Sequence, residues 1–234
     1  MRLVIANKNY SSWSLRAWLL LKQLRIPFEE EKLSFNDPSF KARVRALSPT
    51  GLVPILLDGD LAIWDSLAIV EYLAETFPDR GVWPAAKAAR ARARSVCAEM
   101  HSCFHALRSK LAMNVELDLP LPVLDLETRR DVNRICDLWA DCAHFANGAG
   151  GPFLFGDFSA ADAYFAPVVR RFITYEIGLP EAARRYVATM DALPAMKEWV
   201  AAARAENDFC QFEEPYRDHR SDKLEGEAAT DADE

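Results

Sequence analysis

Short apolar runs alternate with amphipathic segments in the first 84 residues of the chain, and the alternation stops beyond them. Short runs rich in branched side chains are typical of buried strands, whereas apolar residues spaced three or four apart indicate helices. From residue 85 onward only the helical spacing is found, and alanine, the best helix former, rises from seven residues in 1–84 to twenty-six in 85–216. The sequence therefore predicts a mixed α/β N-terminal domain followed by an all-α, helical-bundle C-terminal domain.

The first part of the chain predicts the element order β-α-β-α-β-β-α. Strands are expected over 2–6, 28–33, 54–57 and 61–64, and helices over 14–25, 38–47 and 66–77. The last two strands are joined by Asp58-Gly59-Asp60, which is a hairpin signal because glycine readily adopts positive φ. In the second part we expect helices over 86–116, 124–147, 159–175, 180–192 and 194–204.

Two prolines and a glycine in residues 77–84 mark the domain boundary, because both residue types stop helices. We expect a first domain over 1–80, a linker over 81–85 and a helical domain over 86–212. Residues 213–234 are predicted to form an acidic, disordered tail, since few of them are apolar enough to offset the entropy of ordering. An acidic arm that binds a partner is the alternative for this tail.

Charge and composition exclude several classes of protein. The formal net charge is -7, which argues against nucleic-acid binding. No run approaches about 18 consecutive apolar residues, so no membrane span is expected. The N-terminus lacks the long apolar region of a secretory signal, and five cysteines spread over a long chain do not suggest a disulfide framework. We therefore expect a cytoplasmic protein.

Four motifs occur in a fixed order along the chain. They are Tyr10-Ser-Ser-Trp-Ser-Leu-Arg16, Leu47-Ser-Pro-Thr-Gly-Leu-Val-Pro-Ile-Leu56, Trp64-Asp-Ser-Leu-Ala-Ile-Val-Glu-Tyr-Leu73 and Gly156-Asp-Phe-Ser-Ala-Ala-Asp-Ala-Tyr164. Together they resemble the cytosolic glutathione S-transferases, most closely the serine-type, zeta-like bacterial members, over about residues 1–212. The resemblance implies a thioredoxin-like N-terminal domain, glutathione as co-substrate and a homodimer.

The turn before the first helix is the place where a glutathione enzyme needs its key hydroxyl. The glutathione thiolate is the nucleophile, so the thiol pKa must be lowered, and a helix N-terminus favours negative charge. The first serine of the family motif falls on Ser11, so Ser11 is the predicted catalytic residue and Ser12 the runner-up. A serine that only caps the helix is the alternative. Because this turn holds Ser11-x-x-Ser14 and not two cysteines, dithiol exchange is excluded here.

The resemblance also assigns the glutathione-binding residues, which are Ser11, Ser12, Trp13, Leu52, Val53, Pro54, Asp65 and Ser66. In the family, the valine–cis-proline pair binds the cysteinyl backbone, and the acid–serine pair at a helix start holds the γ-glutamyl carboxylate. Leu52 departs from the usual polar residue, so we expect weaker or altered glutathione binding. Trp13 stands where zeta-like members have cysteine, which weakens the inference of maleylacetoacetate isomerase activity.

The helix expected over 86–116 supplies the acceptor pocket in the family. On it, Met100, Phe104, His105 and Arg108 are predicted to line a pocket beside Ser11. Core and surface positions on an ordinary amphipathic helix are the alternative for each of these residues.

Two further patterns are given no site role. Cys97, His101 and His105 share one helix face, but three ligands from one straight helix span too far for a single ion, so we expect no metal. Ser159 and Asp162 have the spacing of a capping box, which serves folding of the second domain.

The leading functional hypothesis is an enzyme in which a serine-stabilised glutathione thiolate attacks a small apolar electrophile, by conjugation, isomerisation or dehalogenation. The alternative is a non-catalytic relative of the same fold that acts as a binding module. A serine hydrolase is disfavoured because the sequence contains no Gly-x-Ser-x-Gly.

Overall fold

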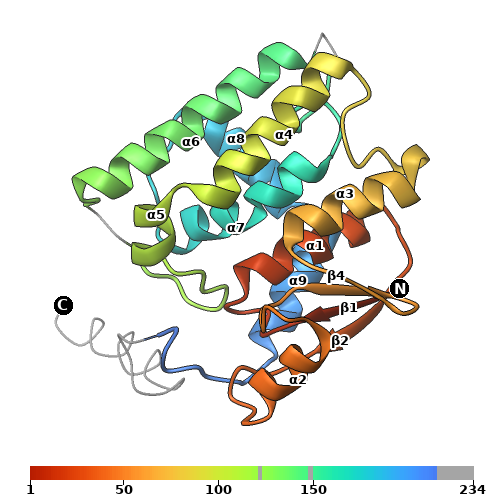
Figure 1. Ribbon diagram of the computed structural model, residues 1–234. Coiled ribbons are helices and arrows are strands. Elements are labelled where there is room, and N and C mark those ends of the chain that lie inside the picture. The colour runs from red at the N-terminus through yellow and green to blue at the C-terminus, as the bar shows by residue number, and fades with distance from the viewer. Residues whose placement is uncertain (121–122, 147–149, 215–234) are drawn as a thin grey trace, which may run out of the picture.

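The computed structural model describes residues 1–120, 123–146 and 150–214 (Figure 1). Its elements follow the predicted order β-α-β-α-β-β-α and then continue as helices. The strands are β1 (Arg2–Ile5), β2 (Glu29–Lys32), β3 (Ile55–Asp58) and β4 (Leu61–Ile63). The helices of the N-terminal domain are α1 (Ser12–Gln23), α2 (Phe40–Leu47) and α3 (Ser66–Thr76), followed by the short 3₁₀ turn η1 (Pro78–Arg80). The C-terminal helices are α4 (Lys87–Ser102), α5 (His105–Lys110), α6 (Leu126–Phe145), α7 (Ala160–Thr174), α8 (Glu181–Asp191) and α9 (Pro194–Arg204).

The N-terminal domain is thioredoxin-like. Its sheet has the order β2-β1-β3-β4, in which β1 pairs parallel to β2 and antiparallel to β3, and β4 closes the hairpin with β3. Side chains alternate across β1, as the pleat requires. Leu3 and Ile5 join the main core with α1 and α3, whereas Val4 joins Val44 of α2 in a small cluster on the other face.

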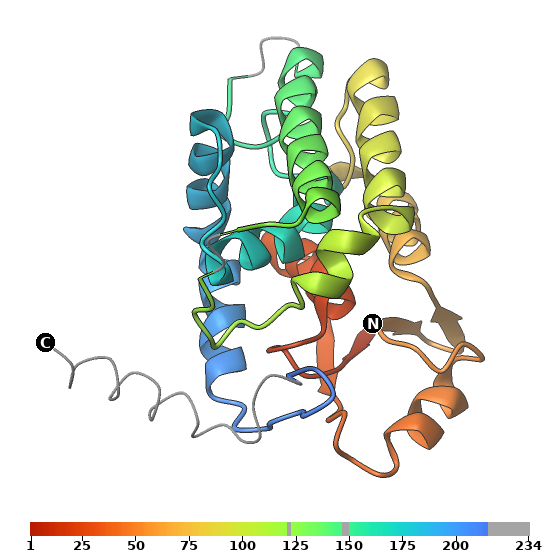
Figure 2. The same cartoon turned by 90° about the vertical axis from the view of Figure 1, so that its left-hand side faces the viewer.

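The C-terminal domain is built around α7, which is buried along most of its length. It packs against α1 of the first domain and against α4 and α8 of its own, so a single hydrophobic core runs through both domains. Figure 2 shows α4 and α6 side by side above the sheet. The predicted capping box at the start of α7 is present between Ser159 and Asp162. In the described part of the chain, no helix has the length and apolarity needed to cross a membrane.

One predicted helix is wrong. The segment 86–116, expected as a single helix, is interrupted at Cys103 and Phe104, between α4 and α5. Phe104 adopts a left-handed backbone with φ of 61° and serves as the N-cap of α5. Its ring is buried in the core, so packing holds a conformation that non-glycine residues seldom adopt.

The chain after α9 returns to the N-terminal domain. Residues 206–214, here called the C-terminal segment, run beside the sheet and the loop that precedes α1 (Figure 2). The acidic tail was expected from residue 213, but Glu214 is buried and accepts a hydrogen bond from Tyr10. The rest of that expected tail, residues 215–234, lies outside the described residues.

Candidate functional site

Ser11 lies at the turn between β1 and α1, with its backbone fixed by a bond from its N–H to the Asn7 carbonyl at 2.8 Å. Its hydroxyl oxygen lies 2.7 Å from that of Ser14, and the Ser14 oxygen accepts a bond from the Ala6 N–H at 3.2 Å. Ser11 occupies the N-cap position of α1, yet its side chain makes no capping bond. Capping therefore does not account for this hydroxyl.

Two adjoining cavities open beside this turn. The larger, about 740 Å³, is called the α3 cavity, and it is lined by Trp13, Thr50, Leu52, Val53, Pro54, Trp64, Asp65, Ser66, Ala68, His101 and Arg108. The smaller, about 490 Å³, is called the α5 cavity, and it is lined by Tyr10, Ser11, Ser12, Trp13, Phe35, Phe40, Gly51, Leu52, Val53, His105, Arg108, Ser109, Ala112, Met113, Arg171 and Glu213. The two share Trp13, Leu52, Val53 and Arg108, so a ligand that fills one borders the other.

The eight residues predicted to bind glutathione all line these cavities. Ser11 and Ser12 line the α5 cavity alone. Pro54, Asp65 and Ser66 line the α3 cavity alone, and Trp13, Leu52 and Val53 line both. The Val53–Pro54 peptide bond is cis, as the family resemblance implied. Leu52 is 68% exposed, so an apolar side chain faces solvent at this position.

The start of α3 lies at the far end of the α3 cavity. The Asp65 carboxylate caps the helix by accepting a bond from the Leu67 N–H at 3.0 Å, and its second oxygen lies 3.1 Å from Nε2 of His101. The Ser66 hydroxyl lies 2.7 Å from that of Tyr164 on α7. The first N–H groups of a helix have no partner within it, so this end is suited to hold an anion.

The four predicted acceptor residues separate into two pairs. His105 and Arg108, on α5, line the α5 cavity. Met100 and Phe104 do not line either cavity, because Met100 lies on the buried face of α4 and Phe104 packs into the core at the break before α5. The expectation that one continuous helix presents all four to the pocket is therefore corrected.

Three guanidinium groups gather around the two cavities. Arg16 is buried with its Cζ 4.0 Å from the centroid of the Trp13 ring, and Arg108 lies 5.0 Å from the same ring. Arg171, on α7, donates to the carbonyls of Leu111 and Pro167. Within the described residues none of the three makes an ion pair with a carboxylate, which is unusual for the two that are buried, Arg16 and Arg171.

Burial has an electrostatic cost for these cations. It lowers the pKa of Arg171 to about 10 and that of Arg16 to about 9. Both remain charged at neutral pH. Glu213, from the C-terminal segment, lines the α5 cavity, where burial raises its pKa and the Arg171 charge opposes that rise. The α5 cavity therefore combines apolar walls with the guanidinium groups of Arg108 and Arg171 and the carboxyl group of Glu213.

Sequence reasoning missed Tyr164, Arg171 and Glu213. Tyr164 ends the fourth motif, but nothing in the sequence places its hydroxyl against Ser66. Arg171 reads as one polar residue of an amphipathic helix, and Glu213 as the start of a tail. Their roles depend on how α7 and the C-terminal segment pack, which no local pattern records.

Cys97, His101 and His105, which share one helix face in the sequence pattern, lie in different surroundings in the structure. Cys97 is buried in the core, His101 pairs with Asp65, and His105 lines the α5 cavity. Over the described ranges, no group of three or more histidine, cysteine or acidic side chains is arranged to hold a metal ion.

Two family models match the chain. The model described as glutathione S-transferase, N-terminal domain, matches residues 10–76, and the model described as glutathione S-transferase, C-terminal domain, matches residues 87–202. Together they cover most of the chain, and the gap between them, residues 77–86, is the segment that joins α3 to α4.

Curated relatives match over different lengths. A dichloromethane dehalogenase from Methylorubrum extorquens is 40% identical over 63 residues, which cover 26% of this chain and 22% of that protein. A probable maleylacetoacetate isomerase from Vibrio cholerae is 26% identical over 208 residues, which cover 87% of this chain and 95% of that protein. The chain thus spans only about a fifth of the first relative but nearly all of the second.

Solved structures share the fold. A maleyl pyruvate isomerase, titled a bacterial glutathione-S-transferase in Zeta class, has a TM-score of 0.67 at 23% identity and covers 88% of this chain and 99% of that one. A glutathione transferase homologue from Burkholderia, with bound glutathione, has a TM-score of 0.64 at 23% identity and covers 87% and 97% of the two chains.

Proposed function

The chain belongs to the glutathione S-transferase family, and from this premise we propose that it is an enzyme in which a glutathione thiolate, stabilised by Ser11, attacks a small electrophile. Glutathione would lie along the α3 cavity with its sulfur at Ser11. The electrophile would occupy the α5 cavity. The glutathione S-transferase and isomerase named among its relatives support glutathione chemistry of this kind.

The observation that carries the proposal is the hydroxyl pair of Ser11 and Ser14. The Ser14 oxygen already accepts from the Ala6 N–H, so its own proton is available to the Ser11 oxygen 2.7 Å away. That leaves the Ser11 proton to be donated into the cavity. A hydroxyl that donates to a thiolate at a helix N-terminus stabilises the charged form and lowers the thiol pKa.

Two other contacts fix the tripeptide in this proposal. The start of α3, at Asp65 and Ser66, holds the γ-glutamyl carboxylate, because helix N-termini attract anions. The backbone of Val53, before the cis-proline, pairs with the cysteinyl backbone. Leu52 gives no polar contact at this point, which supports a weaker affinity for glutathione.

The acceptor that fits the α5 cavity carries a negative charge beside an apolar portion. Arg108 and Arg171 donate to main-chain carbonyls but, among the described residues, form no ion pair. An anionic group on the acceptor would add an ion pair for the half-buried Arg108 and for the buried Arg171, whose charge already acts on Glu213 in the same cavity. Phe35, Phe40 and Met113 supply the apolar walls of the same cavity.

Ser11→Ala tests the proposal, with Ser12→Ala as the matched control. We expect Ser11→Ala to lower kcat about tenfold to a hundredfold, as for the loss of a hydrogen bond to a charged group. The dissociation constant for glutathione should change much less. Ultraviolet titration of the bound thiolate should show a higher pKa in Ser11→Ala than in Ser12→Ala.

Two results would contradict the proposal. Wild-type protein that fails to bind millimolar glutathione would remove its basis. Binding without activity toward conjugation, isomerisation, dehalogenation or peroxidase substrates would favour the alternative of a binding module. We also expect a homodimer, which sedimentation at micromolar concentration measures.

A further inference from the structure

The loop that carries Ser11, residues 7–11, is held mainly by groups far away in the sequence. Its Lys8 carbonyl accepts a bond from the indole N–H of Trp199 at 3.0 Å. The side-chain oxygen of Asn9 accepts bonds from the N–H groups of Val115 and Glu116. These contacts still leave two adjacent peptide N–H groups of the loop, those of Lys8 and Asn9, in need of acceptors.

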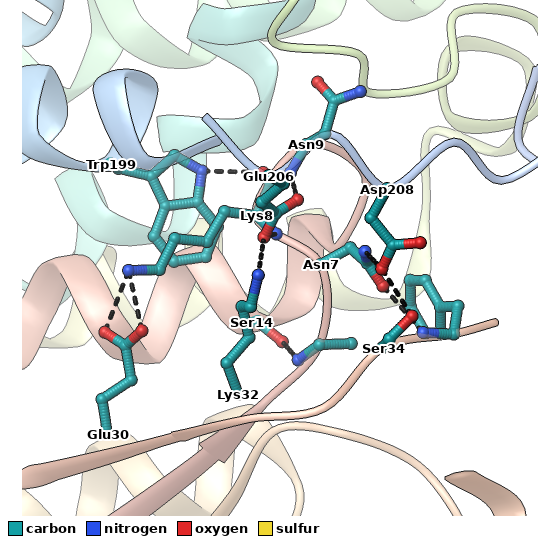
Figure 3. A network of polar contacts seen from close by, with 12 residues as sticks. Asn7, Lys8, Asn9, Ser14, Glu30, Lys32, Ser34, Trp199, Glu206 and Asp208 are labelled. Carbon is teal, nitrogen blue, oxygen red and sulfur yellow. Dashed lines mark hydrogen bonds and ion pairs between the residues drawn. The ribbon is translucent and has the colours of Figure 1, made fainter. Parts of the chain in front are cut away.

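Glu206 supplies both acceptors. One carboxylate oxygen accepts from the Lys8 N–H at 2.6 Å, and the other accepts from the Asn9 N–H at 3.2 Å (Figure 3). The first oxygen also lies 3.0 Å from the ammonium of Lys32 on β2, and the Glu206 side chain is only 2% exposed. A buried, ionised carboxylate that bridges two consecutive amides fixes the peptide plane between them more firmly than a neutral acceptor could.

The remainder of the C-terminal segment adds ties at both ends of the loop. Asp208 accepts from the Asn7 side chain at 2.7 Å and also binds Ser34, in the loop after β2 (Figure 3). Burial alone would raise the pKa of Asp208, but the hydrogen bonds from Ser34, Asn7 and Asn36 together outweigh it and hold the pKa below the usual value. At the other end, the Tyr10 hydroxyl donates to Glu214 at 2.5 Å.

We propose that Glu206 is a positioning residue that acts through the Lys8 and Asn9 amides to hold the Ser11 hydroxyl in line with the glutathione sulfur. The inference rests on the proposed function of Ser11, and it assigns the C-terminal segment to the active site and not to the surface of the helical domain. The backbone from Asn9 to Ser11 has only one residue between, so a tilt of the Lys8–Asn9 peptide is passed directly to Ser11. Misplacement of a reacting group by about 1 Å costs as much as a hundredfold in rate.

Glu206→Gln is the test, because glutamine keeps the size of the side chain but has one acceptor oxygen and no charge. The matched control is Glu198→Gln, which removes a carboxylate from an exposed ion pair with Lys22. Hydrogen exchange of the Lys8 and Asn9 amides in the free protein should accelerate at least about tenfold in Glu206→Gln and stay at the wild-type rate in Glu198→Gln.

The second readout is the pKa of the bound glutathione thiol. We expect Glu206→Gln to raise it and to lower kcat about tenfold, while the dissociation constant for glutathione changes less than threefold. A merely structural carboxylate would change the melting temperature without moving the thiol pKa. If Glu206→Gln does not fold, Tyr10→Phe, which releases the loop from Glu214, should shift the thiol pKa in the same direction.

The outcomes separate this proposal from the proposed function. Unchanged amide exchange or an unchanged thiol pKa in a folded Glu206→Gln protein overturns the positioning role while leaving Ser11 chemistry intact. Failure of wild-type protein to bind glutathione overturns the function of Ser11, and the role of Glu206 in it falls as well.

Discussion

The hydroxyl oxygens of Ser66 and Tyr164 lie 2.7 Å apart, across the interface between the two domains. Ser66 begins α3 in the N-terminal domain, and Tyr164 belongs to α7 in the C-terminal one. A residue proposed to hold the γ-glutamyl carboxylate is therefore oriented by the other domain. On the proposed function, this bond should make glutathione affinity sensitive to Tyr164, which lines neither cavity.

Tyr164→Phe should weaken glutathione binding about fivefold, which corresponds to roughly 1 kcal/mol for one hydrogen bond. The Ser66 hydroxyl would lose the partner that fixes its rotamer. Calorimetric titration measures the change, and the thiol pKa should stay at the wild-type value because Ser11 is untouched. Tyr72→Phe, which removes a hydroxyl bonded to Asp58 on the hairpin, is the control and should leave the affinity unaltered.

Arg171→Met should discriminate between charged and neutral acceptors. For an acceptor that bears a carboxylate, we expect KM to rise about tenfold to a hundredfold, since a hydrogen bond to a charged group is lost. For a neutral acceptor of similar shape, KM should change little. Steady-state kinetics with paired acceptors measures this difference, and Arg185→Met, at a largely exposed site on α8, is the control. Equal effects on both acceptors would refute an anion-binding role for Arg171.

Asp162 should make stability fall as pH rises through the acidic range. Burial raises its pKa to about 6, above the usual value of 3.8, so the folded protein keeps a proton that the unfolded chain releases. Between these two values the folded state binds more protons, and the free energy of unfolding decreases with increasing pH. The free energy of unfolding of the wild type, relative to that of Asp162→Asn, should decrease by on the order of 3 kcal/mol from pH 4 to pH 7.

Urea unfolding at several pH values measures the Asp162 effect. Asp125→Asn is a control of opposite sign, because hydrogen bonds from Thr128 and Lys110 hold the Asp125 pKa below its usual value. Stability from Asp125 is present above the ordinary pKa and is lost as pH falls. The prediction is wrong if the stability of the wild type relative to Asp162→Asn increases with pH. The hydrogen bonds from Leu154, Ser159 and Tyr186 would then lower the Asp162 pKa by more than burial raises it.

Gly151→Ala should destabilise the helical domain, whereas Gly150→Ala should not. A Cβ on Gly151 would lie 2.1 Å from the Gly156 carbonyl oxygen, while a Cβ on Gly150 meets nothing within 4 Å. Backbone would have to move to relieve the first contact, at a cost of about 2–4 kcal/mol, compared with less than about 0.5 kcal/mol at an open surface site. Denaturant midpoints of the two variants provide the comparison, and equal midpoints would contradict the expected steric clash.

The sequence contained enough information for the fold because its strands and most of its helices are specified locally. The branched side chains of β1 favour a strand, and glycine in Asp58-Gly59-Asp60 favours the positive φ of a hairpin turn. Both elements are present as predicted. The break before α5 is different. Met100, Phe104 and Arg108 continue the helical spacing, and no glycine or proline marks the position, so only the packing of the Phe104 ring reveals it.

The site was predictable to the extent that its residues lie in motifs. Ser11, Val53 and Ser66 each lie at the start of a helix or strand. Local sequence signals fix where these elements start, and the starts lie at the cavities. Arg171 and Glu206 could not be found in this way. Each acts through contacts with residues more than 50 positions away, and neither belongs to a local pattern.

The bonds from Glu206 to Lys8 and Asn9 join positions 198 and 197 residues apart. During synthesis on the ribosome, the strands and α1 emerge long before residue 206. The N-terminal domain therefore first exists without the bonds from Glu206 to the loop of residues 7–11. The loop that carries Ser11 can gain its contacts with Glu206 only after α9 has been made and has docked. A nascent chain stalled before residue 206 would therefore carry Ser11 on a loop that lacks both of these bonds, and the proposed positioning of its hydroxyl would follow only once Glu206 has been made.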